Sequence, residues 1–185
     1  MLAPVGGWEQ LKAAVAHGAD AVYFGINDGF NARARAHNFH FHELEEVMAF
    51  LGEYGVKGFA CLNVLVFEEE VERVTRSLLA LERAGVDAVI VQDQGVMTLA
   101  KQVAPGLKIH ASTQASVSSL QGSVYTARNL GAERVVVGRE LSIKEIANID
   151  QGLREMESCD GAEESSSTHS SPSLEVFVHG ALCVR

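Results

Sequence analysis

Apolar and polar positions follow a pattern that recurs along the chain. In each copy, a stretch with apolar residues three or four positions apart ends at a glycine. A short apolar run rich in β-branched side chains begins two or three residues later. The clearest copies are residues 17–25, 84–91 and 130–137, with a looser copy at 54–60. Such a run is typical of a strand buried on both faces, so each copy predicts a helix followed by a buried strand.

This pattern predicts a chain of alternating strands and helices. The seven expected strands cover residues 2–5, 21–26, 58–66, 88–92, 107–112, 134–138 and 174–179, and six helices lie between them. Regular alternation indicates a parallel sheet, either a (β/α) barrel or an open doubly wound sheet. A full barrel has eight βα units and typically about 250 residues. We therefore expect an incomplete TIM-barrel-like α/β barrel that lacks its last βα unit.

Residues 155–173 interrupt the pattern. They contain five acidic residues, several serines and no Lys or Arg. A segment of this composition cannot bury enough apolar area to offset the entropy lost on ordering. We expect it to form a disordered insertion within a single barrel domain that covers residues 1–185 and is itself a fragment of a longer protein.

Composition narrows the function. The net charge of −9 argues against a broad surface for nucleic acid, although much of the acidity lies in residues 155–173 and a local basic site stays compatible. Cys61, Cys159 and Cys183 form no CxxC pair, which argues against a disulfide framework and against a metal site built wholly within this chain. No apolar run has membrane-spanning length and no signal peptide is visible. We expect a cytoplasmic location, with an organelle as the alternative.

Polar residues concentrate where the expected strands end, which is where parallel barrels bind ligands. Arginine forks suit carboxylate and phosphate groups, so this end predicts a site for an anionic molecule. The candidate binding residues are Arg33, Asn63, His110, Gln114 and Arg139. Each of three candidates could instead have a purely structural role. Arg33 could be a solvated loop charge, His110 a hydrogen-bonded residue at the core edge, and Arg139 the ion-pair partner of Glu140.

Other polar features have structural interpretations. We expect Asp93 to cap the helix that follows it and Cys61 to be a small buried residue of a strand. His37, His40 and His42 have a metal-like spacing, but no Cys or acid completes a ligand set. The chain has no P-loop, GxGxxG, GxSxG or HExxH motif, so the motifs support neither a serine hydrolase nor a zinc protease.

The last residues carry a family resemblance. Residues 175–183, EVFVHGALC, resemble the signature of peptidase family U32, the collagenase-like proteases, which begins E-x-F-x-x-G-[SA]-apolar-C. Further similar segments lie at residues 2–6, 18–25, 38–39, 113–114 and 139–142. The resemblance implies a TIM-barrel-like N-terminal domain. It also implies either a peptidase or a protein of RNA or ubiquinone hydroxylation.

The resemblance further implies cofactors and partners. In the hydroxylating members, Cys183 would be the first ligand of a cysteine-held iron–sulfur cluster, prephenate would be a cosubstrate, and tRNA or rRNA would be the partner. A typical cluster needs about four thiolates. The second signature cysteine has no counterpart before Arg185, so we expect an incomplete ligand set and no activity from this chain alone.

Three functional hypotheses follow. The first is RNA hydroxylation, most directly of tRNA, with Arg33, His110 and Arg139 binding an anionic molecule. The second is a peptidase with His179 and Glu175 as catalytic candidates, in which Cys183 pairs with His179. The third is a truncated barrel that binds without turnover and self-associates through its open edge.

Overall fold

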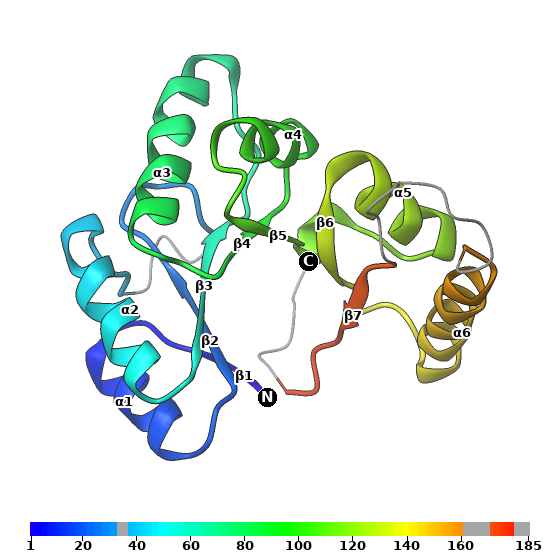
Figure 1. Cartoon of the computed structure of the whole chain (residues 1–185), viewed down its shortest axis with the longest axis horizontal. Helices are drawn as coiled ribbons and strands as arrows, with labels where there is room; N and C mark the ends of the chain where they lie inside the picture. Colours follow the sequence, from blue (N-terminus) through cyan, green and yellow to red (C-terminus); the bar gives the residue numbers. More distant parts are fainter. Residues whose placement is uncertain (33–36, 161–170, 180–185) are drawn as a thin grey trace.

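The structure is a computed structural model that describes residues 1–32, 37–160 and 171–179. Strands and helices alternate from the first element to the last (Figure 1). The strands are β1 Leu2–Pro4, β2 Ala21–Gly25, β3 Lys57–Leu62, β4 Ala88–Val91, β5 Lys108–Ala111, β6 Ala132–Val136 and β7 Ser173–Glu175. The helices are α1 Trp8–Ala16, α2 Leu44–Glu53, α3 Val71–Arg83, α4 Gln94–Val103, α5 Leu120–Leu130 and α6 Ile143–Asp160.

All seven strands form one parallel sheet in the order of the chain. Each strand therefore pairs with the next one along the sequence, as in a (β/α) barrel rather than in a doubly wound sheet. Figure 1 shows the sheet curled, with the helices along its outer side. Within the described residues, β1 and β7 do not pair with each other. The expected incomplete, TIM-barrel-like α/β fold is confirmed.

Side chains alternate between two apolar layers across the sheet. One face of the strands, with Val22, Phe24 and Val89 among its members, packs against the helices. The other face forms a smaller inner cluster of Ala21, Phe59, Cys61, Ala88 and Ile90. The strands are continuously apolar because both faces are buried. Cys61 is 2% exposed, which confirms its interpretation as a buried strand residue.

The recurring glycines end helices as the pattern predicts. Gly18, Gly55, Gly85 and Gly131 have φ between 67° and 79°, in the left-handed region that glycine adopts without strain. At the other end of a helix, Asp93 Oδ1 accepts a hydrogen bond from the Val96 N–H at 3.1 Å, so Asp93 caps α4 as expected.

Several boundaries differ from the prediction, among them the end of β3, which stops at Leu62 and not at residue 66. Helix α6 continues to Asp160, so the expectation of disorder is wrong for residues 155–160, while residues 161–170 lie outside the described residues. The extension is held by local contacts four residues apart, such as Gln151 Nε2 to Glu155 Oε1 at 2.7 Å, and apolar periodicity does not detect these. Strand β7 is also shorter than expected and ends at Glu175.

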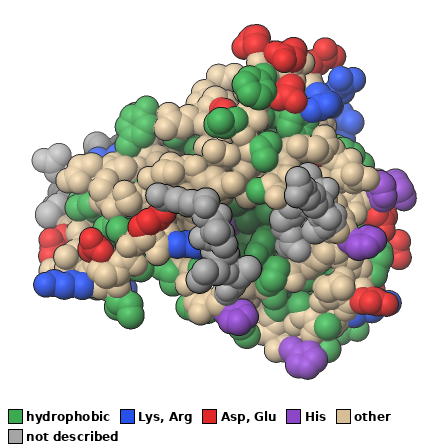
Figure 2. Space-filling model, turned by 180° about the vertical axis from the view of Figure 1, so that it is seen from behind, with side chains coloured by type: hydrophobic (Ala, Val, Ile, Leu, Met, Phe, Trp, Pro, Cys, Tyr) green, Lys and Arg blue, Asp and Glu red, His purple; other side chains and the backbone are tan. Residues whose placement is uncertain are grey.

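The surface carries mixed charge. Figure 2 shows acidic side chains gathered over the start of α3, with basic side chains beside them. Arg73 pairs there with Glu70 at 2.9 Å. On this face, Lys and Arg do not form a continuous patch. No helix of the described part of the chain is long and apolar enough to span a membrane.

Candidate functional site

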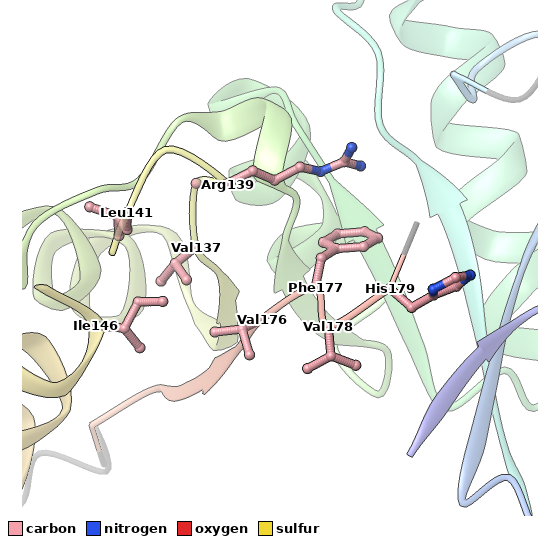
Figure 3. Close-up of a pocket in the computed structure, with 9 residues that line it drawn as sticks. Val137, Arg139, Leu141, Ile146, Val176, Phe177, Val178 and His179 are labelled. Carbon is pink, nitrogen blue, oxygen red and sulfur yellow. The ribbon is translucent and has the colours of Figure 1, made fainter. Parts of the chain in front are cut away.

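A pocket of about 360 Å³ lies where β6 and β7 end (Figure 3). One side is apolar and the other carries an arginine, an aromatic ring and an imidazole. The lining residues are Val137, Gly138, Arg139, Leu141, Ile146, Val176, Phe177, Val178 and His179. The pocket therefore occupies the C-terminal ends of two neighbouring parallel strands, as expected for a ligand site of this fold.

The segment after β7 presents its side chains alternately. Val176 and Val178 point to one side in Figure 3, and Phe177 and His179 point to the other. The guanidinium carbon of Arg139, from the loop after β6, lies 4.3 Å from the centroid of the Phe177 ring. This distance is typical of a cation–π contact. Two residues singled out from the sequence, Arg139 and His179, thus share one pocket.

His110 lies inside the barrel and not in this pocket. It is 4% exposed, and its ring meets the Phe59 ring edge-on with centroids 4.7 Å apart. Burial lowers the pKa of His110 to about 3, and the positive charges of Arg134, Lys108 and Lys57 act in the same direction. Its Nδ1 atom has no hydrogen-bond partner among the described residues. His110 is therefore neutral near pH 7 and adds no positive charge to the C-terminal end of the strands.

Arg134 is a polar residue of the inner face that the sequence analysis missed. Its Nη1 lies 3.2 Å from Glu175 Oε2, its Nε donates to Ser173 Oγ at 3.1 Å, and its guanidinium lies 5.8 Å from the Phe59 ring centroid. An arginine directly before the apolar residues 135–137 of an expected strand is the signal that marks it in the sequence. Glu175, a catalytic candidate from the sequence, is thus the ion-pair partner of Arg134.

The loop after β2 is anchored to two neighbouring elements. Asp28 Oδ1 accepts from the Phe30 N–H at 2.9 Å, and Asp28 Oδ2 accepts from Ser77 Oγ of α3 at 3.1 Å. Burial raises the pKa of Asp28. At the end of β3, Asn63 Oδ1 accepts from the Ala32 N–H at 3.0 Å. Asn63 therefore holds the loop in place just before Arg33, which lies outside the described residues.

Gln114 is separate from the pocket. It is an exposed residue of a single 3-10 turn, Thr113–Ala115, which follows β5. Its backbone N–H donates to Ser112 Oγ at 3.2 Å. Neither Gln114 nor Asn63 lines the pocket at β6 and β7, so the structure does not gather all five binding candidates at one point.

The described residues do not supply a metal centre. Within residues 1–32, 37–160 and 171–179, no three His, Cys, Asp or Glu side chains lie close enough to hold a metal ion. The rings of His40 and His42 stack with centroids 5.4 Å apart. Cys183 lies outside the described residues, and Cys61 is buried in the barrel. This part of the chain therefore does not fit an iron–sulfur cluster.

Fold and pocket together define the class. A curled parallel α/β sheet with a pocket at the C-terminal ends of its strands is part of a TIM-barrel-like protein. A solved structure of a U32 peptidase supports this fold, with a TM-score of 0.64 and 16% identity over 81% of this chain and 63% of that one. The family model for peptidase family U32 matches residues 6–185. The chain belongs to peptidase family U32.

Relatives within the family differ in their activities. An uncharacterized protease of Methanocaldococcus jannaschii is 38% identical over 185 residues, covering 100% of this chain and 41% of the relative. A tRNA hydroxylation protein of Bacillus subtilis is 35% identical over 184 residues, covering 100% of this chain and 39% of the relative. Similar proteins include both RNA hydroxylation proteins and a collagenase. The chain spans about two fifths of the length of the two relatives described here.

Proposed function

We propose that this chain forms the barrel portion of a protein that hydroxylates RNA, with tRNA as the substrate class. The observation that carries the proposal is the 35% identity to a tRNA hydroxylation protein across the full length of this chain. The pocket is compatible with such a substrate because Arg139 offers a cation and Phe177 an aromatic surface at one edge of it.

In this proposal the chain binds the RNA and a cosubstrate and orients them. Arg139, together with Arg33, binds an anionic group, either an RNA phosphate or a carboxylate of a cosubstrate such as prephenate. Asn63 and Gln114 contribute hydrogen bonds at the same end of the sheet. Cys183 is the proposed ligand of an iron–sulfur cluster whose other ligands come from outside the described residues. The protein acts in the cytoplasm.

The test is a gene deletion followed by mass spectrometry of tRNA nucleosides. We expect hydroxylated uridine to disappear in the deletion strain and to return with the intact gene. A gene carrying Arg139→Gln restores less of it than one carrying Arg76→Gln, because Arg76 lies on the exposed side of α3. Hydroxyuridine at its normal level in the deletion strain contradicts the proposal.

A peptidase is the second candidate, favoured by the M. jannaschii relative and by the collagenase. In this reading His179, an exposed residue at the pocket, activates the Cys183 thiol. Purified full-length protein would then cleave gelatin, and both thiol alkylation and His179→Gln would abolish cleavage. Cleavage that survives both treatments excludes this arrangement.

A further inference from the structure

The pairing of Arg139 with Phe177 has a use beyond binding an anion. We infer that this pair is a stacking platform for one unpaired RNA base, with the adjoining phosphate on the edge of the guanidinium. The inference rests on the proposed function, because it assigns part of the RNA contact to the same pocket. Unpaired bases are commonly bound by stacking on aromatic rings and on arginine planes.

The geometry leaves the pair accessible. Phe177 is 42% exposed although it is a large aromatic residue, and Arg139 is an exposed residue as well. The two come from different elements, the loop after β6 and the segment after β7, and meet at 4.3 Å. Within the described part of the chain Arg139 makes no ion pair, so its charge is available to a ligand.

The cavity beside the pair suits a single nucleotide. Its volume of about 360 Å³ lies in the range of small-molecule sites. Val137, Ile146 and Val176 form an apolar side, opposite Phe177 and His179 (Figure 3). A base placed here meets apolar and aromatic surface, while its phosphate meets a cation at the rim.

The charge distribution favours one captured base over a duplex. Binding to a duplex backbone needs many phosphate contacts from Lys and Arg. The chain carries a net charge of −9, and the face in Figure 2 has no continuous basic patch. Stacking one base needs only an aromatic surface and a local cation, which the Arg139–Phe177 pair supplies.

The experiment measures binding of the full-length protein to two labelled strands by fluorescence anisotropy. One is oligouridylate, and the other is an abasic ribose–phosphate strand of the same length. We expect Phe177→Leu to weaken oligouridylate binding about tenfold, since stacking one base contributes on this scale. The abasic strand, which has no base to stack, binds Phe177→Leu and wild type equally.

Further variants separate stacking from charge and from folding. Arg139→Lys keeps the charge and loses the plane, so it also weakens oligouridylate binding more than binding of the abasic strand. Tyr125→Leu is the matched control, because Tyr125 is 52% exposed on α5 and outside the pocket. Phe177→Trp retains binding, and its fluorescence is quenched by oligouridylate and not by the abasic strand. This quenching reports stacking in a variant that still binds RNA.

Three results overturn the inference. They are equal losses on both strands for Phe177→Leu, an equal loss for Tyr125→Leu, and wild-type protein that binds a collagen peptide but not oligouridylate. The mass spectrometry of tRNA nucleosides tests the proposed hydroxylation independently of the binding experiment. If hydroxyuridine persists in the deletion strain while binding depends on the base, the platform stands and hydroxylation falls. If hydroxyuridine is lost but binding ignores the base, the platform falls.

Discussion

A neutral histidine inside the barrel makes stability depend on pH. The folded protein holds the pKa of His110 at about 3, and the unfolded chain returns it toward its ordinary value of 6.5. The unfolded state therefore binds the extra proton between these two values, so stability is fully present above pH 6.5 and falls as the pH drops toward 3. We expect a loss of about 1–2 kcal/mol between pH 6.5 and pH 5 from this residue alone.

Urea unfolding of wild type and His110→Gln at pH 7 and pH 5 checks this. The variant loses less stability than wild type on acidification, because its side chain does not titrate. His110→Asn is a second variant without a titrating side chain and should show the same reduced pH dependence as His110→Gln. The same pH dependence in wild type and His110→Gln would contradict the assignment.

The Arg134–Glu175 ion pair joins β6 to β7. The pair is partly buried, with side-chain exposures of 34% and 19%. We expect a double-mutant cycle with Arg134→Gln and Glu175→Gln to give a coupling of roughly 1 kcal/mol in unfolding free energy. The Lys108–Glu133 pair, at 3.0 Å but more than half exposed, is the control and should couple more weakly. Equal coupling of the two pairs would show that burial adds nothing.

Individual residues were predictable where one local rule decides. Asp93 as a cap and Cys61 as a strand residue followed from position alone. The partners of Glu175 and His110 did not, because they lie on other strands and depend on how the sheet curls. The sequence predicted that His110 lies in an anion site at the ends of the strands, whereas its side chain packs against the Phe59 ring inside the barrel.

At the scale of elements, the end of β2 is a tight point. A Cβ added at Gly25 would overlap Asn38 Oδ1 and Asn31 Oδ1, both from the loop that follows the strand. We expect Gly25→Ala to cost roughly 2–3 kcal/mol in unfolding free energy and to shift this loop. Gly52→Ala in α2 is the control, because open space surrounds Gly52 and alanine favours a helix. Thermal unfolding of both variants tests this expectation. Equal stabilities of Gly25→Ala and Gly52→Ala would contradict the predicted clash.

Elements were recovered where periodicity and a stop signal agree. The left-handed glycines marked the ends of α1, α2, α3 and α5, and apolar runs marked the strands. Helix α6 runs into the segment expected to be disordered because its last turns rely on polar contacts four residues apart, such as Ser158 Oγ to the Arg154 carbonyl at 3.0 Å. A pattern of apolar positions does not include such polar contacts.

The whole molecule shows how far topology follows from order along the chain. Alternating strands and helices led to a parallel sheet in sequential order, and sequential pairing led to a curled barrel wall. The same reasoning placed the site at the C-terminal ends of the strands, where the pocket of β6 and β7 lies. It could not say which candidates meet, since that depends on loop paths, and so Gln114 and Asn63 proved to lie apart from Arg139.

The wall of the barrel is open between β1 and β7 in the described residues. Strands β1 and β7 have one partner each in the described sheet, and open edges pair with other chains. Pro4 removes one backbone donor from β1 and weakens pairing there. After β7, in contrast, Val178 is 90% exposed, and Phe177 adds further apolar surface.

Residues 1–185 expressed alone should therefore associate through the β7 side. Sedimentation velocity should show oligomers that increase with protein concentration, because apolar surface is removed from water on association. Val178→Asp should shift the population toward monomer by placing a charge in the contact. Leu65→Asp, at a residue 60% exposed in the loop before α3, should leave it unchanged. A monomer at every concentration with a sharp thermal transition would show that the open edge is stable in water without a partner.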